Sequence, residues 1–134
     1  MNTLSKEEKQ EILDSLGRII IKKARDRVLL SSMDILTLKT VNLKKKEYYH
    51  NFAGLTKDQQ EAMCDLLSET ISDVIYSILE MFEERERMMK FTIIKDGKEY
   101  DMLEISEKMG SEIACYEENE GWIQRFSEVG RFVL

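Results

Sequence analysis

The chain has 134 residues, 43% of them hydrophobic, which is the size of one ordinary domain with enough apolar material for a single core. We therefore expect one domain over residues 1–134. Twenty basic against 26 acidic residues give a net charge of −6, which argues against a general nucleic-acid binder. No apolar run approaches the roughly 20 residues of a membrane span, and the first residues lack a signal peptide's apolar region, so we expect a cytoplasmic location without membrane contact.

A first helix is predicted from about residue 5 to the high twenties. Ser5 and Glu8 form a capping-box pattern, in which each side chain can bind the other's backbone N–H. Gly17 lies inside the helix at a cost of about 1 kcal/mol relative to Ala, and is typical of a close approach by another element. Three- and four-residue spacing predicts one buried stripe, formed by Ile12, Leu13, Leu16, Ile19, Ile20 and Ala24.

The segment after this helix shows no clean hydrophobic period. Apolar residues are dense from Val28 to Leu43, and we expect a short helix followed by an irregular buried crossing. Residues 44–52 have the pattern of another short helix. Gly54 follows it and favours a left-handed helix terminus.

The strongest pattern predicts a long helix from residue 57 to the late eighties. Thr56 and Gln59 form a second capping box at its start. At 1.5 Å per residue the helix would be about 45 Å long, so its end either projects or breaks near Glu84. Its broad apolar face consists of Met63, Leu66, Leu67, Ile71, Val74, Ile75, Ile78, Leu79 and Phe82.

A β-hairpin is predicted around Asp96 and Gly97, the dipeptide preferred in two-residue turns. This turn pairs Lys95 with Lys98 and Ile93 with Tyr100, which leaves one face apolar beyond the turn. Residues 113–116, 122–126 and 131–134 are candidates for further strands. The predicted fold class is α+β, with a helical N-terminal two thirds, one long central helix and then a small antiparallel hairpin region.

No catalytic or cofactor motif emerges from the residue types that usually supply one. His50 is the single histidine, and no local signature surrounds Cys64 or Cys115. Ser111 follows a glycine but lacks the second glycine of a nucleophile elbow. We therefore expect no enzymatic activity and no cofactor, and the alternative is an enzyme with a dispersed carboxylate or Cys/His site.

Each of two charged clusters could be a binding site or simply a solvated helix surface. Asp65, Glu69 and Asp73 share one helical stripe and could in principle bind a hard cation, but no histidine completes a carboxylate metal site, so we expect no metal. Residues 44–46 are three lysines beside Tyr48 and Tyr49, the ingredients of single-strand binding. The net charge of −6 opposes a polyanion, so a solvated helix start is the preferred interpretation.

Charge asymmetry is the clearest functional signal. Residues 1–54 hold 11 basic and 7 acidic side chains (+4), whereas residues 55–134 hold 9 and 19 (−10). Such a field speeds association with a basic partner, and an aromatic residue can anchor the interface. The predicted partner-binding residues are Glu104, Glu107, Glu117, Glu118 and Glu120 as steering charges and Trp122 as the anchor. The alternative is that Trp122 belongs to the core and the acids only keep the protein soluble.

The C-terminal third, from Ile105 to Glu112 and from Glu120 to Ser127 with its Gly-Trp-Ile start, resembles the endings of small uncharacterised bacterial proteins. Some of these are thought to be immunity proteins for secreted toxins. The resemblance implies a non-enzymatic binder that occludes a basic protein partner. The alternative from a different class is a helical homodimer or assembly element, in which the apolar face of residues 63–82 packs across a two-fold axis.

Overall fold

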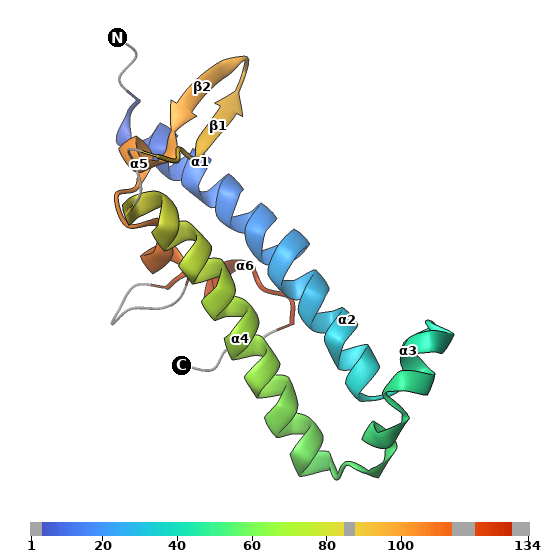
Figure 1. Ribbon diagram of the computed structural model, residues 1–134. Coiled ribbons are helices and arrows are strands. Elements are labelled where there is room, and N and C mark those ends of the chain that lie inside the picture. Colours follow the sequence, from blue (N-terminus) through green and yellow to red (C-terminus); the bar gives the residue numbers. More distant parts are fainter. Residues whose placement is uncertain (1–3, 85–87, 114–119, 130–134) are drawn as a thin grey trace.

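In the computed structural model of the protein, residues 4–84, 88–113 and 120–129 are described. Two long helical rods run antiparallel, and a small two-stranded sheet with short helices follows them (Figure 1). This confirms the α+β class with one long central helix. Among the described residues, no helix combines the length and the apolar character that crossing a membrane requires.

The first rod is longer than predicted and consists of three segments. Helix α1 (Lys6–Ile19) leads without a break into the π-helical segment η1 (Ile20–Asp26) and then into α2 (Arg27–Leu36). The capping box is confirmed, since Ser5 Oγ accepts from the Glu8 N–H at 3.1 Å and Glu8 Oε1 accepts from the Ser5 N–H at 3.2 Å. The expected irregular buried crossing is wrong, because Val41 and Leu43 are 95% and 78% exposed.

The predicted stripe of this rod is only partly buried. Ile12, Leu13 and Leu16 lie in the core, but Ile19 is 59% exposed and Ala24 is exposed. The wider turn of η1 changes the phase of the helix, so a regular 3.6-residue period no longer predicts which side faces inward. A π-helix of seven residues has no signature in the hydrophobic pattern.

The connection between the rods contains α3 (Leu43–Tyr48) and the 3-10 turn η2 (His50–Gly54). The short helix is therefore confirmed, but the left-handed terminus at Gly54 is wrong. Among the described residues a positive φ occurs only at Leu38, Asp96 and Gly97. Chain reversal begins at Leu38 instead, just after α2, with φ of 58°.

The second rod is α4 (Lys57–Glu84), which begins at the predicted capping box. Thr56 Oγ1 accepts from the Gln59 N–H at 3.1 Å, and Gln59 Oε1 accepts from the Thr56 N–H at 2.9 Å. The helix reaches Glu84, and residues 85–87 lie outside the described part. Its apolar face is broader than its buried face, since Leu66, Val74 and Ile78 remain 63%, 54% and 47% exposed.

The predicted hairpin and its register are confirmed. Strands β1 (Thr92–Lys95) and β2 (Lys98–Asp101) pair Lys95 with Lys98 and Ile93 with Tyr100. Asp96 and Gly97 have φ of 54° and 76°, as the twist of a two-residue turn requires. The strand predicted at residues 122–126 is wrong, because Trp122–Phe126 forms helix α6, whose Gln124 side chain caps the Gly121 N–H. Ile113 lies outside any strand, and residues 114–116 and 131–134 lie outside the described part.

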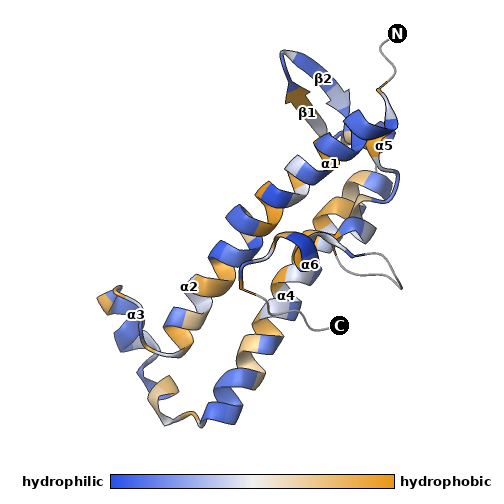
Figure 2. Cartoon of the chain, turned by 180° about the vertical axis from the view of Figure 1, so that it is seen from behind, coloured by the Kyte–Doolittle hydropathy of each residue, from blue (hydrophilic) through white to orange (hydrophobic). Residues whose placement is uncertain are grey.

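The C-terminal elements cover one face of the two rods. These elements are α5 (Met102–Ile105), which contacts α1, the 3-10 turn η3 (Met109–Glu112), which contacts α4, and α6. Helix α6 lies behind the rods in Figure 1 and in front of them in Figure 2. Together we call them the C-terminal layer. We call the part where α1, the second half of α4 and this layer meet the packed end, and the part formed by α2, α3, η2 and the first half of α4 the turn end. The core cluster lies at the packed end, and comprises Ile12, Leu13, Leu16, Ile21, Leu79, Met102, Met109, Ile113, Trp122 and Ile123.

Candidate functional site

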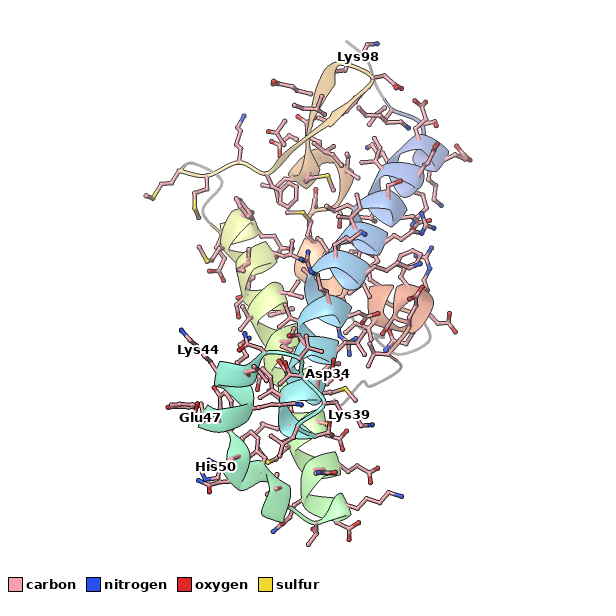
Figure 3. The ribbon with its side chains drawn as sticks, turned by 90° about the vertical axis from the view of Figure 1, so that its right-hand side faces the viewer. Asp34, Lys39, Lys44, Glu47, His50 and Lys98 are labelled. Carbon is pink, nitrogen blue, oxygen red and sulfur yellow. The ribbon has the colours of Figure 1, made fainter. Side chains whose placement is uncertain are left out.

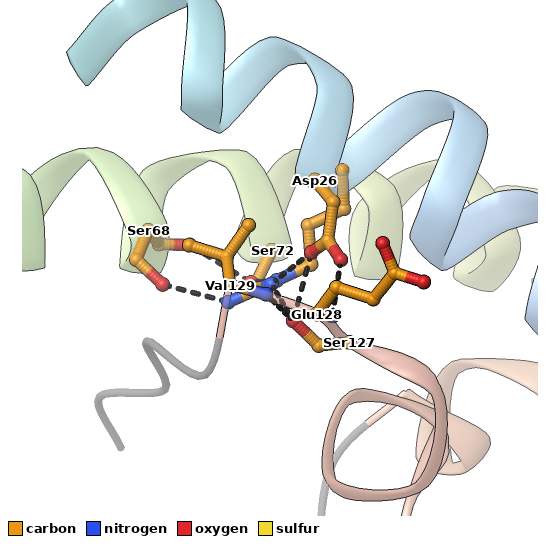
Figure 4. Close-up of polar contacts among 7 residues, drawn as sticks. Asp26, Ser68, Ser72, Ser127, Glu128 and Val129 are labelled. Carbon is orange, nitrogen blue, oxygen red and sulfur yellow. Dashed lines mark hydrogen bonds and ion pairs between the residues drawn. The ribbon is translucent and has the colours of Figure 1, made fainter.

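A buried polar cluster, which the sequence did not reveal, centres on Arg25 in η1 (Figure 4). The side chain is fully buried, and its guanidinium donates to Ser72 Oγ at 3.1 Å and to Ser68 Oγ at 2.8 Å, both on α4. One nitrogen also donates to Asp26 Oδ1 at 2.7 Å and to Ser127 Oγ at 3.0 Å. Arg25 therefore holds the first rod, α4 and the C-terminal segment together.

Asp26 completes this cluster from the side of the C-terminal segment. Its Oδ1 accepts from Ser127 Oγ at 2.8 Å, and its Oδ2 accepts from the Glu128 backbone N–H at 2.7 Å. Only 4% of Asp26 is exposed, so the charge pair with Arg25 is shielded from water. Such a pair, whose carboxylate accepts three hydrogen bonds, orients the segments that supply its partners.

This cluster holds the first rod, α4 and the C-terminal segment in position. Burial lowers the pKa of the Arg25 guanidinium, and the neighbouring Asp26 carboxylate opposes that shift. An arginine stays charged throughout the physiological range, so Arg25 does not exchange a proton near neutral pH. Two signals in the sequence could have located it: adjacent opposite charges inside a helical run, and Ser68 and Ser72 four residues apart on the apolar face of α4.

The residues weighed for nucleophilic catalysis are not organised into a site. His50 is exposed in η2, with Nδ1 at 2.8 Å from the Glu47 carbonyl oxygen. Cys64 is buried in α4, and Cys115 lies outside the described residues. Ser111 lies in η3, where its backbone N–H donates to the Lys108 carbonyl at 3.0 Å.

The carboxylates of α4 likewise form no metal centre. Asp65, Glu69 and Asp73 follow one another along the helix, and Asp73 is exposed. Within the described ranges, no group of three or more His, Cys, Asp or Glu side chains is arranged to hold a metal ion.

The lysine cluster lies on α3 at the turn end (Figure 3). Residues 44–46 are exposed, and the Tyr48 ring is 77% exposed and meets the Tyr49 ring edge-on at 4.8 Å. Tyr49 in turn stacks on Phe52 at 5.4 Å. The three lysines face solvent, whereas Tyr49 and Phe52 turn toward the rods.

These two rings help to form an apolar groove at the turn end. The groove has a volume of about 240 Å³ and lies between α2, the connection and α4. Its lining residues are Ser32, Ile35, Leu36, Tyr49, Phe52, Met63, Leu66 and Leu67. The polar side chains of its lining are Ser32 and Tyr49, and the other six lining residues are apolar, so the groove offers mainly packing surface.

The predicted steering charges are at the surface where the structure describes them. Glu104 on α5, Glu107 after it and Glu120 before α6 are all exposed. Glu117 and Glu118 lie outside the described residues. Glu104 lies on α5, and Asp101 caps the N-terminus of this helix: Asp101 Oδ1 accepts from the Leu103 N–H at 3.0 Å.

Trp122 does not lie where an interface anchor must lie. Its side chain is fully buried in the core cluster, and a Cβ added to Gly17 would overlap the indole ring. The close approach expected at Gly17 is thus confirmed. The anchor role of Trp122 is wrong, and the alternative interpretation, that Trp122 belongs to the core, is confirmed. The indole Nε1 has no hydrogen-bond partner among the described residues, so the apolar area of the ring drives its burial.

Two carboxylates of the packed end differ in their environment. The Arg125 guanidinium donates to Asp14 at 2.9 Å and lowers the pKa of that carboxyl. Burial raises the pKa of Glu112, although a hydrogen bond from Ser106 Oγ at 3.3 Å works in the opposite direction. Arg125 also lies over the Phe126 ring at 4.7 Å, so the contact with Asp14 fixes α6 on α1.

Comparisons with known proteins place no constraint on this site. No protein-family model, curated protein or solved structure matches the chain. The resemblance of the C-terminal third to immunity proteins therefore stays a prediction, and function must be argued from the geometry and charge of the described residues.

Proposed function

We propose that the protein is a non-enzymatic protein-binding module of the immunity or inhibitor type, which occludes a basic partner with its acidic packed end. Glu104, Glu107 and Glu120 act as steering charges, without Trp122 as an anchor. An acidic surface raises the rate at which a basic protein arrives and suppresses other encounters.

The observation that carries this proposal is the free exposure of those three carboxylates. None of them makes a hydrogen bond or an ion pair with another described residue, and Glu120 alone interacts at longer range with a described cation, Arg125. A carboxylate paired within the protein has its field cancelled at short range, whereas an unpaired one acts over roughly a Debye length, about 8 Å at physiological salt. The rigid hold on α5 and α6 keeps Glu104 and Glu120 in place before the partner arrives.

The described residues also support the non-enzymatic part of the proposal. Arg25 and Asp26, the most buried ionisable groups, form hydrogen bonds with each other and with other segments of the chain. No carboxylate, histidine, lysine, arginine or cysteine lines the apolar groove, whose polar side chains are Ser32 and Tyr49. A dispersed carboxylate or Cys/His site remains the alternative, and substitution of His50, Cys64 and Cys115 tests it.

The experiment begins with tagged protein used to capture partners from its native cells at low salt, with the partner identified by mass spectrometry. Association is then measured by stopped flow for the wild type and for the triple variant Glu104→Lys, Glu107→Lys, Glu120→Lys. Each substitution adds two positive charges, so the net charge rises from −6 to 0. We expect association at low salt to slow by about tenfold or more, with little change at high salt.

A matched control separates position from total charge. The triple variant Asp34→Lys, Glu47→Lys, Glu61→Lys also raises the net charge from −6 to 0, at exposed positions of the turn end. This control should keep most of the wild-type rate. Equal slowing by both variants would show that net charge alone acts, and an unchanged rate in the first variant would refute steering by the packed end.

A further inference from the structure

A hollow with three basic side chains in its lining lies beside the Arg25 cluster, and we call it the basic hollow. It has a volume of about 330 Å³ and is lined by Lys22, Lys23, Asp26, Arg27, Leu30 and Glu128. In an α-helix, Lys22 and Arg27 would lie about 140° apart, because each residue turns the helix by about 100°. The wider π-helical turn of η1 brings residues five positions apart nearly to the same side, so η1 is what gathers these cations.

The basic hollow has an excess of positive charge. The Asp26 carboxylate turns into the Arg25 cluster, where it accepts three hydrogen bonds and the Arg25 guanidinium neutralises it (Figure 4). Among the lining residues, Glu128 is therefore the one carboxylate that opposes the three cations. Three positive charges against one negative charge leave an excess of two.

Two of the three cations have no partner within the described ranges. Lys23 and Arg27 are exposed, and neither forms a hydrogen bond or an ion pair there. Lys22 pairs with Glu128 at 3.2 Å, but the Glu128 side chain is 78% exposed, so this contact is weak and readily exchanged. The basic hollow thus offers two ammonium groups and one guanidinium, which can bind an oxyanion through two parallel N–H groups.

From this arrangement we infer that the basic hollow binds the phosphate group of a small phosphate monoester. Such a group carries a charge of about −1.5 to −2 at neutral pH, which matches the excess of two positive charges, whereas a carboxylate supplies only half of it. The volume of about 330 Å³ lies at the lower end of the range of small-molecule sites, about 300–1,000 Å³. It therefore has room for an organic part beside the phosphate, and Leu30 provides an apolar contact for that part.

A small dianion fits the basic hollow better than an acidic protein does. The net charge of −6 opposes a large polyanion, which meets the field of much of the surface. A small ligand meets mainly the charges of the hollow itself, because salt screens charges further away than about 8 Å. An acidic protein would also present singly charged carboxylates, and Glu128 already supplies one of these.

The first experiment measures affinity by titration calorimetry at low salt, with phenyl phosphate, inorganic phosphate, benzoate and a glutamate-rich peptide as probes. We expect phenyl phosphate to bind at least about tenfold more tightly than benzoate, because of its second charge. It should also bind more tightly than inorganic phosphate, because the ring contacts Leu30. Absence of binding, or equal affinity for phenyl phosphate and either small anion, would overturn the inference. Tighter binding of the peptide would overturn it in favour of an acidic protein.

A pair of variants locates the site. Lys23→Gln, Arg27→Gln should weaken the binding of phenyl phosphate at least about tenfold, because both unpaired cations are lost. The matched control Lys44→Gln, Lys45→Gln also lowers the net charge from −6 to −8, at exposed positions of α3, and should keep most of the affinity. Equal losses in both variants would show that total charge alone acts, and would overturn the site.

A third variant predicts a gain of affinity. Glu128→Gln removes the opposing charge and releases Lys22, while the backbone N–H that Asp26 binds is retained, so phenyl phosphate should bind about threefold more tightly. The control Glu61→Gln removes an exposed charge of the turn end and should change little. An unchanged or weaker affinity with Glu128→Gln would overturn the assignment to the basic hollow. All these variants keep Glu104, Glu107 and Glu120, so the result is independent of the steering proposal.

Discussion

The packed end and the turn end of the same two rods are held together by very different amounts of buried apolar surface. The core cluster of the packed end is formed by three layers of elements, so a side chain such as Trp122 is enclosed on all sides. At the turn end, Leu29, Leu36 and Cys64 are the apolar residues that are buried between α2 and α4. Two helices alone cannot enclose a core, so the third layer decides where the free energy of folding is concentrated.

The largest expected effect is at Trp122. Replacing it with Ala removes a fully buried indole and leaves a cavity above Gly17, which should lower the free energy of unfolding by about 3–5 kcal/mol. Denaturant unfolding followed by circular dichroism measures this loss, since the single tryptophan is no longer present as a fluorophore. Tyr48→Ala at the turn end is the control and should change stability by less than about 0.5 kcal/mol. Similar losses in both variants would contradict the contrast between the two ends.

The second expected effect concerns the Arg25 cluster, which lies between the two ends. Asp26→Asn keeps the shape of the side chain but leaves the buried guanidinium without its counter-charge, so stability should fall by about 2–3 kcal/mol. Thermal or denaturant unfolding measures it. Glu128→Gln removes an exposed ion pair with Lys22 from the same segment and should cost less than about 0.5 kcal/mol. A small loss with Asp26→Asn would mean that water or another anion replaces the carboxylate.

The smallest expected effect is at Glu112 and depends on pH. Because burial raises the pKa of this carboxyl, the folded state binds its proton more tightly than the unfolded state does. Its contribution is therefore favourable at low pH and is lost as the pH rises through the raised pKa. Glu112→Gln should stabilise the protein at neutral pH by less than about 1 kcal/mol, and the gain should vanish below pH 4.5.

Denaturant unfolding at a series of pH values measures this difference. The control Glu104→Gln changes an exposed carboxylate, which stays hydrated in both states, so no comparable gain is expected at neutral pH. A gain of equal size in both variants would mean that relief of the overall negative charge, rather than burial of Glu112, is responsible.

Features that depend on residues close in sequence were predictable. The capping boxes at Ser5 and Thr56 and the hairpin at Asp96 were all confirmed, because their hydrogen bonds join residues three to nine positions apart. The long α4 was predictable from its period for the same reason. The helix through residues 20–26 was predicted as well, but the buried side beyond Leu16 was not, since the π-helical turn changes the period from which that side is inferred.

Features that depend on distant residues were not predictable. Trp122 is enclosed by α1, more than 100 positions earlier in the chain, so its sequence neighbours carried no sign of its burial. The more distant partners of Arg25 are Ser68, Ser72 and Ser127. Ser68 and Ser72 share one face of α4, but no local pattern joins that face to Arg25 or to Ser127. The exposure of the acids was predictable from their charge alone, whereas their freedom from ion pairs required the three-dimensional arrangement.

The π-helical segment makes the first rod tolerant of a change in length at one place. Before η1, Gly17 faces the C-terminal layer, and after it Leu29 and Leu36 face α4. A π-helical turn holds about one residue more than an α-helical turn, so deletion of a single residue within η1 would allow an unbroken α-helix and leave Leu29 and Leu36 on nearly the same side. The same deletion within α1 would rotate everything beyond it by about 100°, because an α-helical turn has no extra residue to lose. The first rod can therefore lose one residue in η1 at a smaller cost to its packing than anywhere else along its length.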